Sequence, residues 1–336
     1  IARQHNIYEC RNNQLLLAAL QQIRPTVDKM ISSFGIDRIG VVLGTSTSGV
    51  RSTEQALAYQ AKNGALPDQF HYKQQQMGAG ADFLAACLGL TGPAYTISTA
   101  CSASGKAFAS ARRLINLDFC DAVIIGGADS LCGLTINGFA ALESLSTDYC
   151  KPFGLHRNGI NIGEAASLFV LSKAPGPVQL LGIGASSDAY HFSAPDPTGT
   201  AVITAMKKAL DDANKRPNQV DYINLHGTAT VLNDAMESKA VNAIFGTKVA
   251  TSSSKGMTGH TLGAAAALEL GFCWMLLAEN NNGHLIPNIN DDEPDPALLP
   301  LHLVKKDETL SRHLQVCQSN SFAFGGNNVS IVIAKT

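Results

Sequence analysis

Concentrated positive charge and long apolar runs are both missing from this sequence. Its 25 Lys and Arg residues are balanced by 27 Asp and Glu, which gives a formal net charge of −2 over 336 residues. Without a basic run, nucleic acid is not an implied partner. No apolar stretch reaches the roughly 18 residues of a transmembrane helix, and no signal peptide is visible. We therefore expect a cytoplasmic protein without a membrane span.

Paired cysteines are missing as well. The eight cysteines are scattered and form no C-x-x-C pair. The spacing of a zinc site is thus absent, and a disulfide scaffold is not expected at this length. We predict free thiols in a reducing compartment and no bound metal. Aromatic residues contribute only 6%, whereas the chain has 30 glycines, a composition typical of closely packed α/β layers.

Short apolar runs alternate with helical stretches along the whole chain. Runs such as "RIGVVLGTS" and "DAVIIGGAD" have the length and composition of buried strands, and "TAVITAMKKALDDAN" is amphipathic. The stretches "EAASLFVLSKA" and "VQLLGIGASSDA" look like a pair of neighbouring strands. The alternation predicts an α/β fold whose sheets are covered by helices. Residues 95–128 and 220–278 share one plan of strand, small-residue turn and small-residue helix, which suggests two related halves.

One cysteine, Cys101, lies in an unusual stretch, "STACSASGK". The preceding run is strand-like and the following one is helical, so the thiol is predicted at a helix N-terminus. There the helix dipole lowers the pKa of a thiol, and free backbone N–H groups can stabilise an oxyanion. The small neighbours leave the approach to the sulfur open. A buried structural cysteine is the alternative, and it is the favoured interpretation for the other seven.

Two histidines lie at similar junctions. His226 in "NLHGTAT" follows a predicted strand, and His260 in "SSSKGMTGHTLGAAAALE" precedes an alanine-rich helix. A helix N-terminus disfavours an imidazolium, so His260 is expected to be neutral. Lys255 and Glu269 flank it and, if buried, would need each other as partners. The alternatives are a satisfied loop histidine for His226 and a surface ion pair for the charged residues.

Near the C-terminus, "SFAFGGNN" places Phe322 and Phe324 before paired glycines, which let a backbone approach a ligand closely. The set "TACSASG", "HGTAT", "KGMTGHTLGAAAALE" and "SNSFAFGGNN", in this order, resembles the β-ketoacyl-acyl-carrier-protein synthases of the thiolase superfamily. The Cys-His-His set is similar to that of the elongating synthases. A thiolase would carry a second cysteine near these glycines, and chain-initiating synthases use Cys-His-Asn.

The resemblance implies a duplicated α/β thiolase-like fold in five layers, α-β-α-β-α. Residues 1–172 would form the half that carries the nucleophile. Residues 173–336 would form the half that carries both histidines and the Phe-Gly-Gly turn. The family's opening strand, helix and loop are missing before Ile1, so we expect the chain to begin inside a longer gene product.

The resemblance also implies roles for single residues. Cys101 matches the nucleophile that takes the acyl chain from a carrier-protein thioester. His226 and His260 match the histidines that assist decarboxylation of a malonyl thioester, where two imidazole N–H donors can hold the enolate. Phe324 matches the gating aromatic residue, whose backbone N–H joins that of Cys101 in the oxyanion hole.

Further positions match supporting roles in the family. Lys255 and Glu269 match a structural and electrostatic pair near the second histidine. The other matches are threonines that bind the pantetheine arm, aromatic residues of the substrate site and acidic residues near it: Thr228 and Thr230, Phe139 and Phe322, and Asp234 and Glu237. Core packing is the alternative for Phe139, and a solvated helix face is the alternative for the acidic pair. No cofactor is implied, because the substrates are carried on the phosphopantetheine of an acyl carrier protein.

Three departures from the family pattern point to a specialised branch. Asn158 in "RNG" replaces a common aspartate, and Asn327 stands where threonine is common. The loop between "LST" and "PFGLHRNG" is several residues shorter than usual. We interpret these changes as a branch that serves polyene or polyketide-like lipids with a chain-length-factor partner.

The predicted function is decarboxylative Claisen condensation of a malonyl carrier protein with an acyl group on Cys101. The alternatives are a non-catalytic or partner-dependent subunit and, less favoured, a Cys-His hydrolase or amidotransferase, which leaves the second histidine unexplained. The expected partners are an acyl carrier protein and a second subunit, in a homodimer or a heterodimer with a chain-length-factor-like chain. The acidic carrier should meet a basic patch, for which the candidates are Arg3, Arg11, Arg112 and Arg113.

Overall fold

The computed structural model describes residues 7–278, 283–291, 293 and 295–336. The chain divides into two compact units, each made of segments that are distant in sequence. One unit comprises Ile1–Gly138, Gly163–Ala174 and Thr261–Leu268, and the other Phe139–Ile162, Pro175–His260 and Glu269–Thr336. Segment 139–162 precedes residue 172 but belongs to the second unit, and segment 261–268 follows it but belongs to the first. The division into halves at 172/173 stays a prediction.

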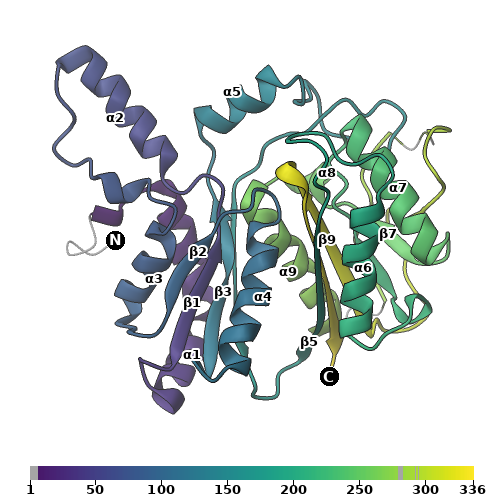
Figure 1. Cartoon of the computed structure of the whole chain (residues 1–336), viewed down its shortest axis with the longest axis horizontal. Helices are drawn as coiled ribbons and strands as arrows, with labels where there is room; N and C mark the ends of the chain where they lie inside the picture. The colour runs from purple at the N-terminus through teal and green to yellow at the C-terminus, as the bar shows by residue number, and fades with distance from the viewer. Residues whose placement is uncertain (1–6, 279–282, 292, 294) are drawn as a thin grey trace. The chain divides into compact units, whose positions relative to one another are not determined.

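The first unit is built on a four-stranded mixed sheet in the order β2-β1-β3-β4 (Figure 1). Strands β2, β1 and β3 are parallel, and β4 is antiparallel to β3. The elements are α1 (Arg11–Phe34), β1 (Ile39–Gly44), α2 (Val50–Asn63), α3 (Ala79–Leu88), β2 (Ala94–Ile97), α4 (Ala103–Asn116), β3 (Ala122–Asp129), α5 (Gly133–Ala141) and β4 (Ala165–Ser172). Helix α5 runs into the second unit, which begins at Phe139.

Alternation along β1 assigns the helices to the two faces of this sheet. Val41 and Leu43 join a core formed with Leu16 of α1 and Phe83 of α3. The opposite face of β1 packs against α4. There the two backbones approach so closely that a Cβ atom on Gly44 would lie 2.1 Å from the Ser104 nitrogen. Both faces are therefore covered, as the continuous apolar runs predict.

The second unit is built on a six-stranded mixed sheet in the order β5-β10-β9-β6-β7-β8 (Figure 1). Strands β5, β10 and β9 are antiparallel to one another, whereas β9, β6, β7 and β8 run parallel. The elements are β5 (Val178–Ser187), α6 (Thr200–Asp212), β6 (Tyr222–Asn224), α7 (Val231–Phe245), β7 (Ala250–Ser252), α8 (Lys255–Thr258), α9 (Ala265–Ala278), β8 (His302–Leu303), β9 (Val316–Ala323) and β10 (Asn327–Lys335). The first four residues of α9 belong to the first unit. Met206 of α6 and Met236 of α7 pack with Ile223 and Val332 in the core of the second unit.

The expected pairing of the strands at 164–174 and 178–189 is wrong. Strand β4 pairs with β3 in the first sheet, and β5 pairs with β10 in the second. The connection between β4 and β5 contains Pro175 and Pro177, and proline fixes φ and removes a backbone donor. A tight hairpin is therefore disfavoured, and each strand finds its partner in a different sheet.

Candidate active site

Cys101 lies at the strand-to-helix junction that the sequence predicts. It comes two residues before the first residue of α4, and only 5% of its surface is exposed. The turn before it is tight, because Ala100 has φ of 50° and the Ala103 N–H donates to the Ala100 carbonyl at 3.0 Å. A non-glycine residue with positive φ is uncommon and marks a constrained turn. The thiol is thereby held close to the N-terminus of a 14-residue helix.

The small residues after Cys101 have a packing role that the sequence interpretation did not include. Ala103, Ser104 and Ala107 are fully buried on the face of α4 that approaches Gly44. The Ser104 hydroxyl also accepts a hydrogen bond from the Ala267 N–H at 2.9 Å. A larger side chain at 104 would push the helix off the sheet, so close helix–strand packing is one reason for the slim sequence.

Asp129, at the end of β3, is a buried carboxylate that sequence reasoning missed. Its Oδ1 accepts hydrogen bonds from the Thr45 and Thr47 hydroxyls and from the Ser46 and Thr47 N–H groups, at 2.7–2.8 Å. Its Oδ2 accepts from the Ala264 N–H at 3.0 Å. Burial raises the pKa of Asp129, whereas these donors lower it. The only signal in the sequence was an acidic residue directly after an apolar strand.

The two predicted histidines lie side by side in the second unit. The His226 and His260 rings meet edge to face, with centroids 5.4 Å apart, and each residue is only 2% exposed. Burial, followed by the charge of Lys255, holds the pKa of both well below the usual value. This direction agrees with the expectation of a neutral His260, with burial as the main cause and the charge of Lys255 as the second. Two neutral imidazoles offer N–H donors without a positive charge.

Lys255 and Glu269 are a buried ion pair, so the surface alternative is wrong. Their side chains are 1% and 2% exposed. The Lys255 ammonium also donates to the His226 carbonyl at 2.6 Å. Burial raises the pKa of Glu269 to about 6, against the opposing effect of Lys255. The pair thus satisfies two buried charges and fixes the main chain of one histidine.

Asp234 and Glu237 of α7 are also buried, and the solvated alternative is wrong for both. Glu237 accepts hydrogen bonds from the His226 N–H at 2.8 Å and from the Gly227 N–H at 2.7 Å. Asp234 accepts from the Phe153 N–H at 2.8 Å. Burial raises the pKa of Asp234 to about 6 and that of Glu237 to about 8. These carboxyls hold the backbone of the first histidine segment in place.

The remaining predicted residues lie in the second unit, and each lies close to another residue of the predicted site. The Thr228 and Thr230 hydroxyls are 2.9 Å apart. The Phe322 ring lies 5.9 Å from the His226 ring, and the half-buried Phe139 lies 5.5 Å from Phe324 between ring centroids. Phe139 therefore packs on the predicted gating residue.

The Phe-Gly-Gly turn is bonded to a segment that the sequence did not single out. The Gly325 N–H donates to the Phe192 carbonyl at 2.7 Å, and the Asp188 N–H donates to the Gly326 carbonyl at 2.9 Å. Both glycines have positive φ, 76° and 72°, which explains why the turn needs glycine. The turn that follows Phe324 is thus coupled to residues 188–192.

The other sequence expectations concern charge, thiols and membranes. None of the eight cysteines forms a disulfide bond, and the described residues contain no cluster of His, Cys, Asp or Glu that could hold a metal ion. Over the same residues, no helix is both long and apolar enough to cross a membrane. Of the basic candidates, Arg3 lies outside the described residues, Arg11 is paired with Glu164, and Arg112 and Arg113 lie on α4.

Comparison with known proteins identifies the family. Residues 19–175 match the N-terminal domain of β-ketoacyl synthases, and residues 178–290 match the C-terminal domain. Nodulation protein E of Rhizobium meliloti is 34% identical over 303 residues, which cover 87% of this chain and 74% of that protein. The 3-oxoacyl-[acyl-carrier-protein] synthase 2 of Synechocystis is 31% identical over 338 aligned positions, covering 95% and 80%. The chain belongs to the β-ketoacyl synthase family.

A solved structure agrees with this assignment. The ketosynthase ApeO of Xenorhabdus doucetiae, determined with its chain length factor ApeC, superposes with a TM-score of 0.93 at 46% identity, covering all of this chain and 84% of that one. The predicted thiolase-like α/β fold is confirmed, with two mixed sheets. The predicted class of enzyme, an acyltransferase that forms a carbon–carbon bond, is confirmed for this β-ketoacyl synthase.

Proposed function

We propose that Cys101 is the nucleophile of this β-ketoacyl synthase. Its thiolate attacks the thioester of an acyl carrier protein, the pantetheine thiol leaves, and the acyl group is held on the Cys101 sulfur. The position of Cys101 before α4 supports this role, because a helix N-terminus stabilises a thiolate. The backbone N–H groups of Cys101 and Phe324 are the proposed donors to the tetrahedral oxyanion.

His226 and His260 serve the second half of the reaction. When a malonyl thioester loses carbon dioxide, the electron pair of the broken bond moves toward the thioester oxygen. Two neutral imidazole N–H groups can hold that enolate. Its carbon then attacks the acyl group on Cys101, the new carbon–carbon bond forms, and the sulfur leaves as thiolate. The observation that carries this proposal is the buried, edge-to-face pair of neutral histidines.

Surrounding residues prepare this pair without contacting substrate. Lys255 and Glu237 bind the main chain of His226 from two sides, through its carbonyl and its N–H.

Other residues are assigned to substrate contacts. We assign Thr228 and Thr230 to the pantetheine arm, since their adjacent hydroxyls can hydrogen-bond to its amides. Phe139, Phe322 and Phe324 are the proposed aromatic contacts of the acyl chain.

The partners are an acyl carrier protein and a second ketosynthase-like subunit. The ApeO ketosynthase is in complex with a chain length factor, and another related structure is described as the ishigamide ketosynthase/chain length factor. A type II polyketide ketosynthase has been solved with its acyl-carrier protein. By analogy we assign this chain to polyene or polyketide-type elongation, in a heterodimer with a chain-length-factor-like chain. The half-buried edge strand β2 is the proposed contact, since an unpaired edge can accept a partner strand.

The experiment follows the acyl group by intact mass. Purified protein, with its candidate partner subunit, is incubated with a panel of acyl carrier proteins and then with malonyl carrier protein. We expect an acyl adduct that disappears in Cys101→Ala, followed by a β-ketoacyl product. Free acid or ammonia without a new carbon–carbon bond would favour a hydrolase or amidotransferase. Unchanged activity of the complex with Cys101→Ala would assign catalysis to the partner.

A further inference from the structure

Both histidine segments of the second unit are bonded to one short stretch, residues 159–161. The His260 N–H donates to the Asn161 carbonyl at 2.7 Å, and Ile162 forms a parallel bridge with His260. At the other end, the Gly159 N–H donates to the Ala229 carbonyl at 3.0 Å, three residues after His226. The 159–161 segment therefore supports the backbone on both sides of the histidine pair.

Glycine is required at the start of this segment. Gly159 has φ of 135°, and a Cβ atom there would lie 2.4 Å from the Ser144 carbonyl oxygen. The neighbouring Ile160 forms two backbone hydrogen bonds with residues 144–146. Its N–H donates to the Ser144 carbonyl, and its carbonyl accepts from the Ser146 N–H, both at 2.8 Å. The 159–161 segment is thus bonded to residues 144–146 as well as to the histidine segments.

The Asn161 side chain makes the third attachment of the segment. Its Oδ1 accepts a hydrogen bond from the Cys150 N–H at 2.7 Å, and its Nδ2 donates to the Asp148 carbonyl at 2.8 Å. The Cys150 thiol in turn donates to the Lys255 carbonyl at 3.1 Å. The Asn161 side chain therefore binds the loop at 148–150, while the main-chain carbonyl of the same residue accepts the His260 N–H. This loop belongs to the region where the chain is shorter than the family pattern.

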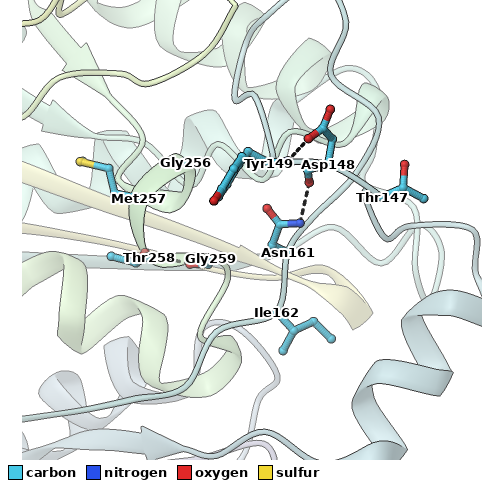
Figure 2. A pocket seen from close by; sticks show the side chains of 9 residues that line it. All are labelled: Thr147, Asp148, Tyr149, Asn161, Ile162, Gly256, Met257, Thr258 and Gly259. Atoms are coloured by element: carbon cyan, nitrogen blue, oxygen red, sulfur yellow. Dashed lines mark hydrogen bonds between the residues drawn. The ribbon is translucent and has the colours of Figure 1, made fainter.

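The Asn161 side chain also lines a cavity of about 440 Å³ in the second unit. Figure 2 shows its amide near Asp148 and Tyr149, among the residues that line this cavity. No catalytic candidate lines this cavity, so a substitution of Asn161 need not touch substrate.

We propose that Asn161 is a positioning residue for His260. Its two side-chain bonds fix its own backbone, and its carbonyl fixes the main chain of the histidine. Without those bonds the 148–150 loop and residue 161 relax, and His260 moves relative to the enolate oxygen. This inference rests on the proposed decarboxylating role of His260, whereas loading of Cys101 does not need that histidine. A displacement near 1 Å can cost roughly 100-fold in rate.

Asn161→Ala is the test variant, and Asn158→Ala is its matched control. Asn158 lies in the same stretch but makes one exposed bond, from the Ser146 hydroxyl to its Oδ1 at 2.6 Å. We expect Asn161→Ala to slow carbon dioxide release from malonyl carrier protein by about 10- to 100-fold while acyl loading changes less than about 2-fold. Asn158→Ala should leave both rates within about 2-fold of wild type.

Asn161→Asp separates the two bonds. The carboxylate still accepts from the Cys150 N–H, but its second oxygen faces the Asp148 carbonyl without a proton to donate, so its decarboxylation rate should be lower than that of wild type. Equal losses of loading and decarboxylation in Asn161→Ala would indicate a general structural defect and overturn the proposal. Unchanged rates for both steps would overturn it as well.

Hydrogen exchange gives a readout that does not depend on the reaction. The His260 amide should exchange faster in Asn161→Ala than in wild type or Asn158→Ala, because its acceptor is less firmly held. If wild type fails to load or condense, the proposed function fails, and exchange alone then judges the positioning. Equal exchange in Asn161→Ala and the control would overturn it.

Discussion

At the scale of single residues, the histidine pair depends on neighbouring groups that hydrogen-bond to the main chain of each histidine. Glu237 receives the N–H of His226, Lys255 binds its carbonyl, and the Asn161 carbonyl receives the N–H of His260. Glu237 and Lys255 are buried, so their polar groups are satisfied by these bonds instead of by water. The geometry of the proposed catalytic pair therefore depends on residues that bind its main chain.

The buried pair of Lys255 and Glu269 should show strong coupling. Lys255→Met or Glu269→Leu alone leaves one buried ionisable group without its partner, which costs about 3–5 kcal/mol. The double variant Lys255→Met/Glu269→Leu replaces both by apolar groups, so its loss should be smaller than the sum of the single losses. Urea unfolding of the four proteins measures this. Additive losses would show that the two groups act independently.

Glu237 should make stability depend on pH. Its pKa is raised from 4.5 to about 8 by burial, so the folded protein holds this proton more tightly than the unfolded chain. The resulting stabilisation is complete below the unfolded pKa and is lost as the pH rises through about 8. Glu237→Gln cannot ionise at this position. The stability of wild type minus that of Glu237→Gln should therefore fall between about pH 5 and pH 8.

Thermal unfolding of both proteins across that pH range checks this prediction. Asp234 and Glu269 titrate in both proteins, so their contributions largely cancel in the difference. A difference that stays constant with pH would mean that Glu237 is not the group that titrates.

At the scale of elements, the sequence predicts most strands and the helices that follow them. β1 and β3 were predicted as apolar runs, β2 as the strand-like run before Cys101, α4 as the helical run after it, and α9 as the alanine-rich helix after His260. The sheet assignment of β4 and β5 was not, because partner choice depends on contacts far apart in sequence. Apolar periodicity predicts whether a segment forms a helix or a strand, but it does not predict which strand will be its neighbour in a sheet.

The burial of α7 was similarly hidden. The helix reads "VLNDAMESKAVNAIF", in which Asp234 and Glu237 look like parts of a solvated face. In the folded chain Glu237 accepts from the His226 and Gly227 N–H groups, and Asp234 accepts from those of Phe153 and Ala229, so both carboxyls are buried with backbone donors as partners. The motifs of the proposed catalytic residues can be read from the sequence, whereas these supports depend on tertiary packing. Nothing in the sequence around Asn161 marks its three attachments.

The contact between β1 and α4 should tolerate no added methyl group. A Cβ atom on Gly44 would lie 2.1 Å from a backbone nitrogen of α4, which cannot move aside as a flexible side chain can. We expect Gly44→Ala to destabilise the protein by more than about 3 kcal/mol, or to prevent folding. Gly78→Ala is the control, because that glycine has an ordinary φ of −71° and no atom within 4 Å of an added Cβ.

Expression level and urea unfolding distinguish the two variants. Gly78→Ala should remain within about 0.5 kcal/mol of wild type. A folded Gly44→Ala with wild-type stability would show that α4 can shift on the sheet, and the small residues after Cys101 would then need another explanation.

At the scale of the whole molecule, the proposed reaction draws on both compact units. Cys101 belongs to the first unit, and His226 and His260 belong to the second. Acyl loading and decarboxylation can therefore be removed separately, with Cys101→Ala for the former and His226→Ala for the latter. In a pair with a chain-length-factor-like subunit, only one of the two chains would carry the nucleophile. The complete catalytic set must then come from one chain.

Mixing the two inactive variants tests that conclusion. We expect Cys101→Ala and His226→Ala copies, co-expressed with different affinity tags and purified as mixed assemblies, to form no more β-ketoacyl product than either variant alone. If the site were shared between two copies of this chain, each mixed dimer would contain one intact set and recover about half of the wild-type turnover. Recovery at that level would reject the one-chain site. It would also favour a functional homodimer over the heterodimer, because the intact set would then need a second copy of this chain.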